Sequence, residues 1–217
     1  MSDELFAAMR QSVIEGEAEQ AEALAHQALQ SGIEPLAAIN QGFVPGMTTV
    51  GEQFGCGQAF VPDLMMAAEA MKKGMAVLEP ALRASGVERQ VLGRVVLGTV
   101  KGDIHEIGKS LVALMLSTGG FEVHDLGVDV PFEKFAAKAR EVNADLVGVS
   151  ALLTTTMPGQ AKVIQALEAA GLRPKVKVMV GGAPVSRGWA EQIGADGYSE
   201  DALGALAVAK SLMGTQP

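Results

Sequence analysis

Gly98-Thr-Val-Lys-Gly-Asp-Ile-His-Glu-Ile-Gly-Lys-Ser110 is the stretch on which the interpretation of this 217-residue chain depends. An apolar run, 95–97, leads into it, and an amphipathic run, 107–116, follows it, a pattern typical of a β-strand that turns into a helix. In open α/β sheets, ligands bind at such strand-to-helix corners. The cluster of Asp103, His105 and Gly108 is therefore the first candidate site.

The rest of the C-terminal half alternates between short apolar runs and helical patterns. This alternation predicts an α/β fold of the flavodoxin or Rossmann type, with a five-stranded parallel sheet and helices on both faces. The predicted strands are 95–100, 122–125, 146–150, 176–180 and 197–198, and the predicted helices are 104–117, 132–142, 155–170, 184–193 and 201–213.

The N-terminal part, by contrast, has apolar residues three and four apart, which indicates helices. Four are predicted, at 3–15, at 17–30, at 35–54 with a bend at Pro45, and from 62 onward. Short connections between such helices favour an antiparallel four-helix bundle. A linker at 85–90 would separate two domains, residues 1–88 and residues 89–217.

Three marked segments are expected to meet at one edge of the sheet. If the strands take the order 2-1-3-4-5, the first, third and fourth strands are neighbours and their carboxyl ends share one rim. Those ends carry polar or small residues and one leucine, namely Asp103 and His105, then Ser150 and Leu152, then Gly181 and Gly182. A binding crevice at this rim is the prediction.

These three segments also carry a resemblance. Asp103-x-His105-x-x-Gly108, followed by Ser150-Ala-Leu152 and Gly181-Gly182, resembles the cobalamin-binding motif of corrinoid proteins and of methionine synthase. The likeness extends over nearly the whole chain and is closest to the small corrinoid methyl-carrier proteins of methylamine and methanol methyltransferase systems.

The resemblance implies cobalamin, a cobalt corrinoid, as the cofactor. His105 would be the metal ligand, replacing the cofactor's own base below cobalt, with Asp103 on its other ring nitrogen and Ser150 behind. The cofactor's nucleotide would enter the α/β domain, where Ser150 and Thr154 would contact it and the two glycines would leave room. The cofactor-binding residues implied in this way are Gly102, Asp103, Ile104, His105, Glu106, Gly108, Ser150, Leu152, Thr154, Gly181 and Gly182.

The activity that the resemblance implies is methyl transfer as the corrinoid component of a methyltransferase system. Co(I) would take a methyl group from a substrate held by one methyltransferase, and methyl-Co(III) would give it to a second enzyme that serves a thiol or a folate. The implied partners are these two methyltransferases and a reductive activation protein. Similar carriers serve methylamines, methanol, glycine betaine and methoxylated aromatics, and because the partner enzyme selects the methyl donor, the motifs leave the donor open.

The helical half would then be a cap over the cofactor. By analogy with the same family, Phe60, Leu64 and Met65 are cap candidates that shield the upper face. The residues alone favour another interpretation, since methionines and leucines at helical spacing are typical of core packing.

The sequence leaves two alternative functions. A phosphate-binding loop is suggested by Gly-Lys-Ser at 108–110, but five residues lie between Gly102 and Gly108, where that motif has four. A cobalamin-dependent sensor without turnover is the second alternative. It normally has a DNA-binding or signalling domain, which this chain does not show.

Composition restricts the remaining classes. A formal charge of −8 without a basic cluster argues against nucleic-acid binding, and the single cysteine, Cys56, cannot form an intrachain disulfide. No signal-peptide pattern and no apolar run long enough to span a bilayer is present. A soluble, cytoplasmic protein is the expectation.

Overall fold

The computed structural model describes residues 2–85 and 91–214, without the side chains of Arg83 and Ser85. The chain divides into two compact units, Met1–Gln90 and Val91–Pro217. The predicted linker lies outside the described residues apart from Ser85, which is the last residue of a helix.

A five-stranded parallel sheet forms the centre of the second unit. Its strands run in the order β2-β1-β3-β4-β5, which confirms the predicted order. Thr99 of β1 pairs with Ser150 of β3, and Ser150 pairs with Gly181 of β4, so the ends of the three central strands lie in one row. The strands are β1 (Arg94–Thr99), β2 (Glu122–Asp125), β3 (Leu146–Ser150), β4 (Lys177–Gly181) and β5 (Gly197–Tyr198).

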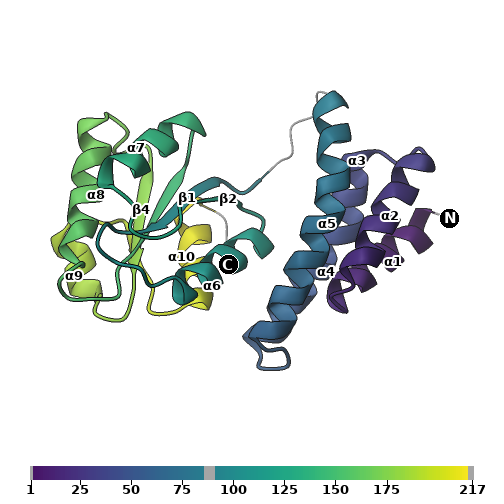
Figure 1. Cartoon of the computed structure of the whole chain (residues 1–217), viewed down its shortest axis with the longest axis horizontal. Coiled ribbons are helices and arrows are strands. Elements are labelled where there is room, and N and C mark those ends of the chain that lie inside the picture. The colour runs from purple at the N-terminus through teal and green to yellow at the C-terminus, as the bar shows by residue number, and fades with distance from the viewer. Residues whose placement is uncertain (1, 86–90, 215–217) are drawn as a thin grey trace. The chain divides into compact units, whose positions relative to one another are not determined.

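Helices cover both faces of this sheet, as Figure 1 shows. One face packs against α7 (Phe132–Glu141), α8 (Pro158–Ala169) and α9 (Arg187–Gln192), and the other against α6 (Ile107–Thr118) and α10 (Ala202–Leu212). Because both faces are buried, the central strands are apolar at nearly every position rather than alternating.

The main difference from the sequence prediction lies at the start of α6. The helix was expected from residue 104, but it begins at Ile107. Asp103 does not cap it, because its carboxylate accepts hydrogen bonds from the amides of His105 and Leu152, and the N-cap residue is Glu106. Residues 103–106 therefore form a loop whose shape is set by long-range contacts, which no local pattern encodes.

The first unit is helical throughout its described length, apart from short connections. Its elements are α1 (Ser2–Ile14), α2 (Ala18–Gln30), α3 (Pro35–Ala37), the π-helical segment η1 (Ala38–Phe43), α4 (Val44–Gly55) and α5 (Val61–Ser85). The third predicted helix is thus interrupted by a π-helical segment just before Pro45, which lies in the first turn of α4. The antiparallel four-helix arrangement stays a prediction.

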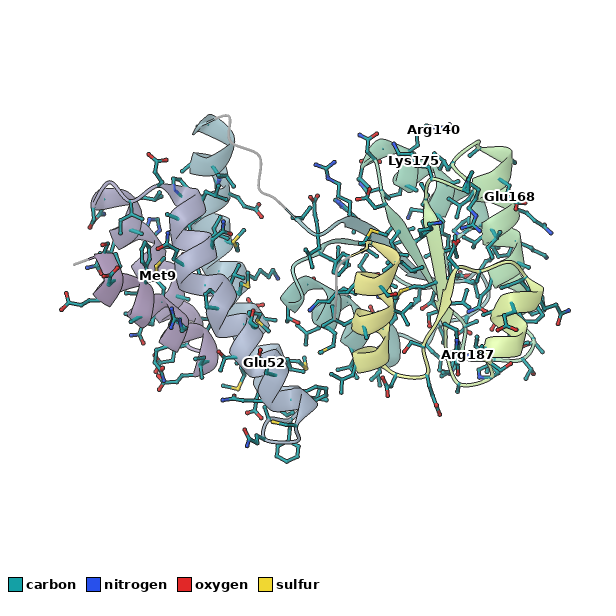
Figure 2. The ribbon with its side chains drawn as sticks, turned by 180° about the vertical axis from the view of Figure 1, so that it is seen from behind. Met9, Glu52, Arg140, Glu168, Lys175 and Arg187 are labelled. Carbon is teal, nitrogen blue, oxygen red and sulfur yellow. The ribbon has the colours of Figure 1, made fainter. Side chains whose placement is uncertain are left out.

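Met9 of α1 is at the centre of this helical unit. Figure 2 shows it among the helices, and its side chain is fully buried. A Cβ atom on Gly42 would lie 2.9 Å from the Met9 sulfur, and one on Gly46 would lie 2.6 Å from the Arg10 carbonyl oxygen. The two glycines therefore let α1 pack directly against η1 and α4.

None of the helices in the described parts of the chain combines the length and the apolar character needed to cross a membrane.

Candidate functional site

His105 and Asp103 form a hydrogen-bonded pair beyond the end of β1. The His105 Nδ1 atom lies 2.7 Å from Asp103 Oδ1, and the His105 amide donates to the same oxygen at 3.1 Å. The Asp103 side chain is fully buried, whereas the His105 side chain is 45% exposed. The second ring nitrogen, Nε2, has no hydrogen-bond partner among the described residues and is free to bind a ligand.

The other oxygen of Asp103 is also bonded. Its Oδ2 atom accepts from the Leu152 amide at 2.7 Å and from the Thr156 hydroxyl at 2.6 Å. Burial alone would raise the pKa of Asp103, but the hydrogen bonds from Thr156, Leu152 and His105 outweigh it and hold the pKa well below its ordinary value. Asp103 is therefore an ionised carboxylate, and it fixes the proton of the His105 ring on Nδ1.

The loop that holds His105 is tied down from two further elements. The Thr99 hydroxyl donates to the His105 carbonyl at 3.0 Å. The Gly102 amide donates to the Asp129 carboxylate at 2.7 Å, and the Asp129 amide donates to the Asp103 carbonyl at 2.9 Å. Asp129 has a φ of 53°, a conformation that costs a non-glycine residue energy. Because carboxylates already occupy the amides of Gly102 and His105, this loop is not built to receive phosphate.

A cavity of about 680 Å³ opens beside this loop. Its walls come from the ends of β1, β3 and β4, the first turns of α6 and the segment after β5, on the side of the sheet that α6 and α10 cover. The lining includes Leu97, Ile107, Leu111, Val112, Val149, Met179, Ser199 and Asp201. A mostly apolar pocket with a few polar groups at one rim is typical of a small-molecule site.

Two glycines at the cavity have different roles. A Cβ atom on Gly108 would meet nothing within 4 Å apart from its chain neighbours and the backbone of its own helix, so this position borders open space. Gly182 has a φ of +121°, and a Cβ atom there would lie 1.9 Å from the Ala151 carbonyl oxygen. Gly182 is therefore required by the fold, whereas the open space beside Gly108 is available to a ligand.

The structure brings most of the sequence-predicted site residues together. The cavity is lined by Ile104, His105, Glu106, Gly108, Ser150, Leu152, Gly181 and Gly182. Gly102 and Asp103 lie behind His105 and support its loop, while Thr154 is exposed and does not line the cavity. Among the described residues, the hydroxyl that donates to Asp103 belongs to Thr156 and not to Ser150.

The three cap candidates differ from one another in exposure. Phe60 and Met65 are exposed, and with their neighbours Val61 and Met66 they form an apolar patch at the start of α5. Leu64 is fully buried. An exposed apolar patch of this kind is available to a ligand or a partner, whereas a buried leucine contributes to packing.

Sequence reasoning did not select several residues at the site. Asp129 and Thr156 support the His105 loop, and Ser199 and Asp201 line the cavity after β5. Ser199 and Asp201 could have been selected by extending to β5 the reasoning that ligands bind at the carboxyl ends of parallel strands. No local pattern marks Asp129, because its role depends on the approach of the β2–α7 loop.

Replacing Thr156 by valine is expected to lower the free energy of unfolding of the α/β unit by about 2 kcal/mol. The buried Asp103 carboxylate would lose a charge-assisted hydrogen bond while remaining ionised. Urea unfolding followed by the fluorescence of Trp189, the only tryptophan, measures this change. Thr155→Val, at the exposed neighbouring position, is the matched control, and an equal loss there would contradict the assigned role.

Two family profiles match the chain, and both are described as a B12 binding domain. One matches residues 93–207, which make up most of the α/β unit and more than half of the whole chain. The other matches residues 5–79, within the helical unit. Both units therefore correspond to domains found in B12-binding proteins.

Individual proteins agree with these profiles. The chain is 53% identical to dimethylamine corrinoid protein 1 of Methanosarcina mazei over 181 residues, 83% of each chain. It is 47% identical to trimethylamine corrinoid protein 2 of Methanosarcina acetivorans over 204 residues, 94% of each chain. A solved structure also matches, that of the methanol:cobalamin methyltransferase complex MtaBC of Methanosarcina barkeri. The match covers 100% of this chain and 83% of the matching chain in the complex, with 30% identity and a TM-score of 0.89. The resemblance seen in the three motifs is thus confirmed, and the chain belongs to the family of B12-binding corrinoid proteins.

Proposed function

We propose that this chain is a methyl carrier, which holds a corrinoid in its α/β unit and passes a methyl group between two methyltransferases. The observation that carries the proposal is the His105–Asp103 pair, whose free Nε2 atom lies on a loop beside a large apolar cavity at the rim of the sheet. Cobalamin is the cofactor of the family to which the chain belongs.

The residues around the loop fit a corrinoid. Ile104 and Ile107, on either side of His105 in the chain, are 76% and 83% exposed and line the same cavity, so exposed apolar side chains flank the histidine. The open space beside Gly108 leaves room for a bulky group. His105 would ligate cobalt, and the cavity that Ser150 and Gly181 line would take the nucleotide of the cofactor. When bound, the corrinoid supplies a cobalt ion that accepts and releases a methyl group.

The protein's own residues prepare the histidine for this task. The ionised Asp103 carboxylate accepts a hydrogen bond from the Nδ1–H group of His105. The lone pair of Nε2 is therefore available to a metal. Thr156 and the Leu152 amide hold Asp103 in place, and Thr99 holds the backbone of His105. One protein side chain would be enough to hold cobalt, because the corrin ring itself would supply the other nitrogen ligands.

We further propose that the methyl donor is a methylated amine held by a partner methyltransferase. The relatives named for dimethylamine and trimethylamine are 53% and 47% identical to this chain, whereas the chain in the methanol complex is 30% identical. Because the methanol complex is named as a methyltransferase complex, it supports a methyltransferase as a direct partner of this chain. A second methyltransferase that serves a thiol or folate acceptor, and a reductive activation protein, complete the proposed set.

Residues 1–88 are proposed to act as the cap and residues 89–217 as the cofactor-binding domain. The exposed apolar patch of Phe60, Val61, Met65 and Met66 is the part of the helical unit suited to shield a reactive group from water. Phe60 and Met65 are therefore the favoured cap residues, and Leu64 is their buried support.

Cobalamin loading tests the proposal. The protein mixed with hydroxocobalamin and then desalted is expected to retain about one corrinoid per chain, with the absorption spectrum of cobalt ligated by histidine. ATP treated in the same way is expected to wash off. Loss of the corrinoid on desalting would refute the proposed function, and retention of ATP would instead support a nucleotide site.

A further inference from the structure

Gln160 is a fully buried polar residue on α8 whose amide nitrogen and oxygen are both hydrogen-bonded. Its Nε2 atom donates to the Val149 carbonyl at 2.9 Å and to the Gly181 carbonyl at 3.1 Å. Its Oε1 atom accepts from the indole Nε1 of Trp189 on α9 at 2.9 Å. One side chain thus joins β3, β4 and α9.

The two carbonyl groups lie where β3 and β4 end. The last pair of the ladder is Ser150 with Gly181, and beyond it the Ala151 amide donates to the Gly181 carbonyl at 3.2 Å. Val149 and Gly181 themselves line the cavity. Gln160 reaches the same backbone from the face of the sheet that α7, α8 and α9 cover, opposite α6 and α10.

A buried amide that makes three hydrogen bonds restricts its partners to a single arrangement. An unpaired amide would be costly to bury, so Gln160 is tolerated only when both carbonyls and the indole stand at the right distance. An apolar side chain of similar volume would fill the space without this constraint. The network therefore fixes the spacing between the ends of β3 and β4.

From this geometry we propose that Gln160, oriented by Trp189, is a positioning residue that sets the width of the opening through which the nucleotide of cobalamin enters. The inference rests on the proposed function, because it requires that the cavity take this part of the cofactor. Gln160 does not touch the cofactor and acts through Val149 and Gly181.

Comparing two ligands in the full-length protein tests the inference. Cobalamin and cobinamide share the corrin ring and the cobalt, but cobinamide lacks the nucleotide. Gln160→Met keeps the length of the side chain and removes all three hydrogen bonds. Its dissociation constant for hydroxocobalamin, measured by absorption titration, is expected to rise about tenfold, and that for cobinamide to stay within about twofold of the wild-type value.

Two further variants make the result decisive. Gln165→Met makes the same substitution at an exposed position of α8 and is expected to change neither constant. Trp189→Phe keeps an aromatic ring but removes the indole donor together with part of the ring system. It is expected to weaken cobalamin binding about threefold, and it decides the question if Gln160→Met does not fold. Equal weakening of both ligands, or none in a folded variant, would overturn the inference. Failure of the wild-type protein to bind cobalamin would instead refute the proposed function.

Discussion

Replacing His105 by alanine is expected to remove the histidine-ligated form of the bound corrinoid and to slow methyl transfer by about 100-fold or more. Loss of a partner that merely orients a metal ligand costs 10- to 100-fold, so loss of the ligand itself should cost at least as much. The absorption spectrum of the loaded variant and the rate of methyl transfer with the partner enzymes measure the two effects. The fold should be intact, because the His105 side chain is 45% exposed.

Adding free imidazole tests whether the loss of a nitrogen ligand to cobalt causes the slower methyl transfer. In His105→Ala, free imidazole can occupy the space left by the side chain and restore an axial nitrogen. Partial recovery of both the spectrum and the rate is expected. The control variant His124→Ala, on β2, should behave as wild type with and without imidazole. Unchanged methyl transfer in His105→Ala would contradict the assignment of the metal ligand.

The second large effect is expected at the turn after β4. Gly182→Ala should lower the free energy of unfolding of the α/β unit by about 4 kcal/mol, the upper range for single substitutions, because it combines backbone strain with a direct clash. The φ of +121° disfavours any side chain, and the new Cβ atom would lie 1.9 Å from the Ala151 carbonyl oxygen. Trp189 lies in the α/β unit, so its fluorescence during urea unfolding reports on this unit separately from the helical one.

Gly108→Ala is the matched control for this prediction. Gly108 lies at the start of α6, has ordinary helical geometry and faces no other atom within 4 Å, so the alanine variant should fold with unchanged or slightly higher stability. The added methyl group would project into the proposed corrinoid space, and cobalamin affinity should fall. Similar stability losses in both variants would show that the space beside the two glycines had been assigned wrongly.

Much of the α/β fold could be predicted from the sequence because its causes are local or topological. Strands such as Leu146–Ser150 are short apolar runs between helical patterns, and short crossovers restrict the order of the strands. That order places the ends of β1, β3 and β4 in one row, which is why His105, Ser150 and Gly181 could be assigned to one crevice without any contact being known.

The support of His105 could not be predicted in the same way. The resemblance placed Ser150 behind the pair, but the hydroxyl that donates to Asp103 is that of Thr156, whose position depends on how the chain turns after β3. Asp129 comes from a different loop altogether. The start of α6 at Ile107 follows from these contacts, so helix propensity placed it three residues too early.

The edges of the sheet affect how the protein can meet its partners. At one edge, β5 has only two residues, and at the other β2 has four, among them Glu122, His124 and Asp125. Neither edge offers the long apolar strand that another protein needs in order to extend the sheet through main-chain hydrogen bonds. A partner is therefore expected to bind through side chains on the surface rather than by adding a strand to the sheet.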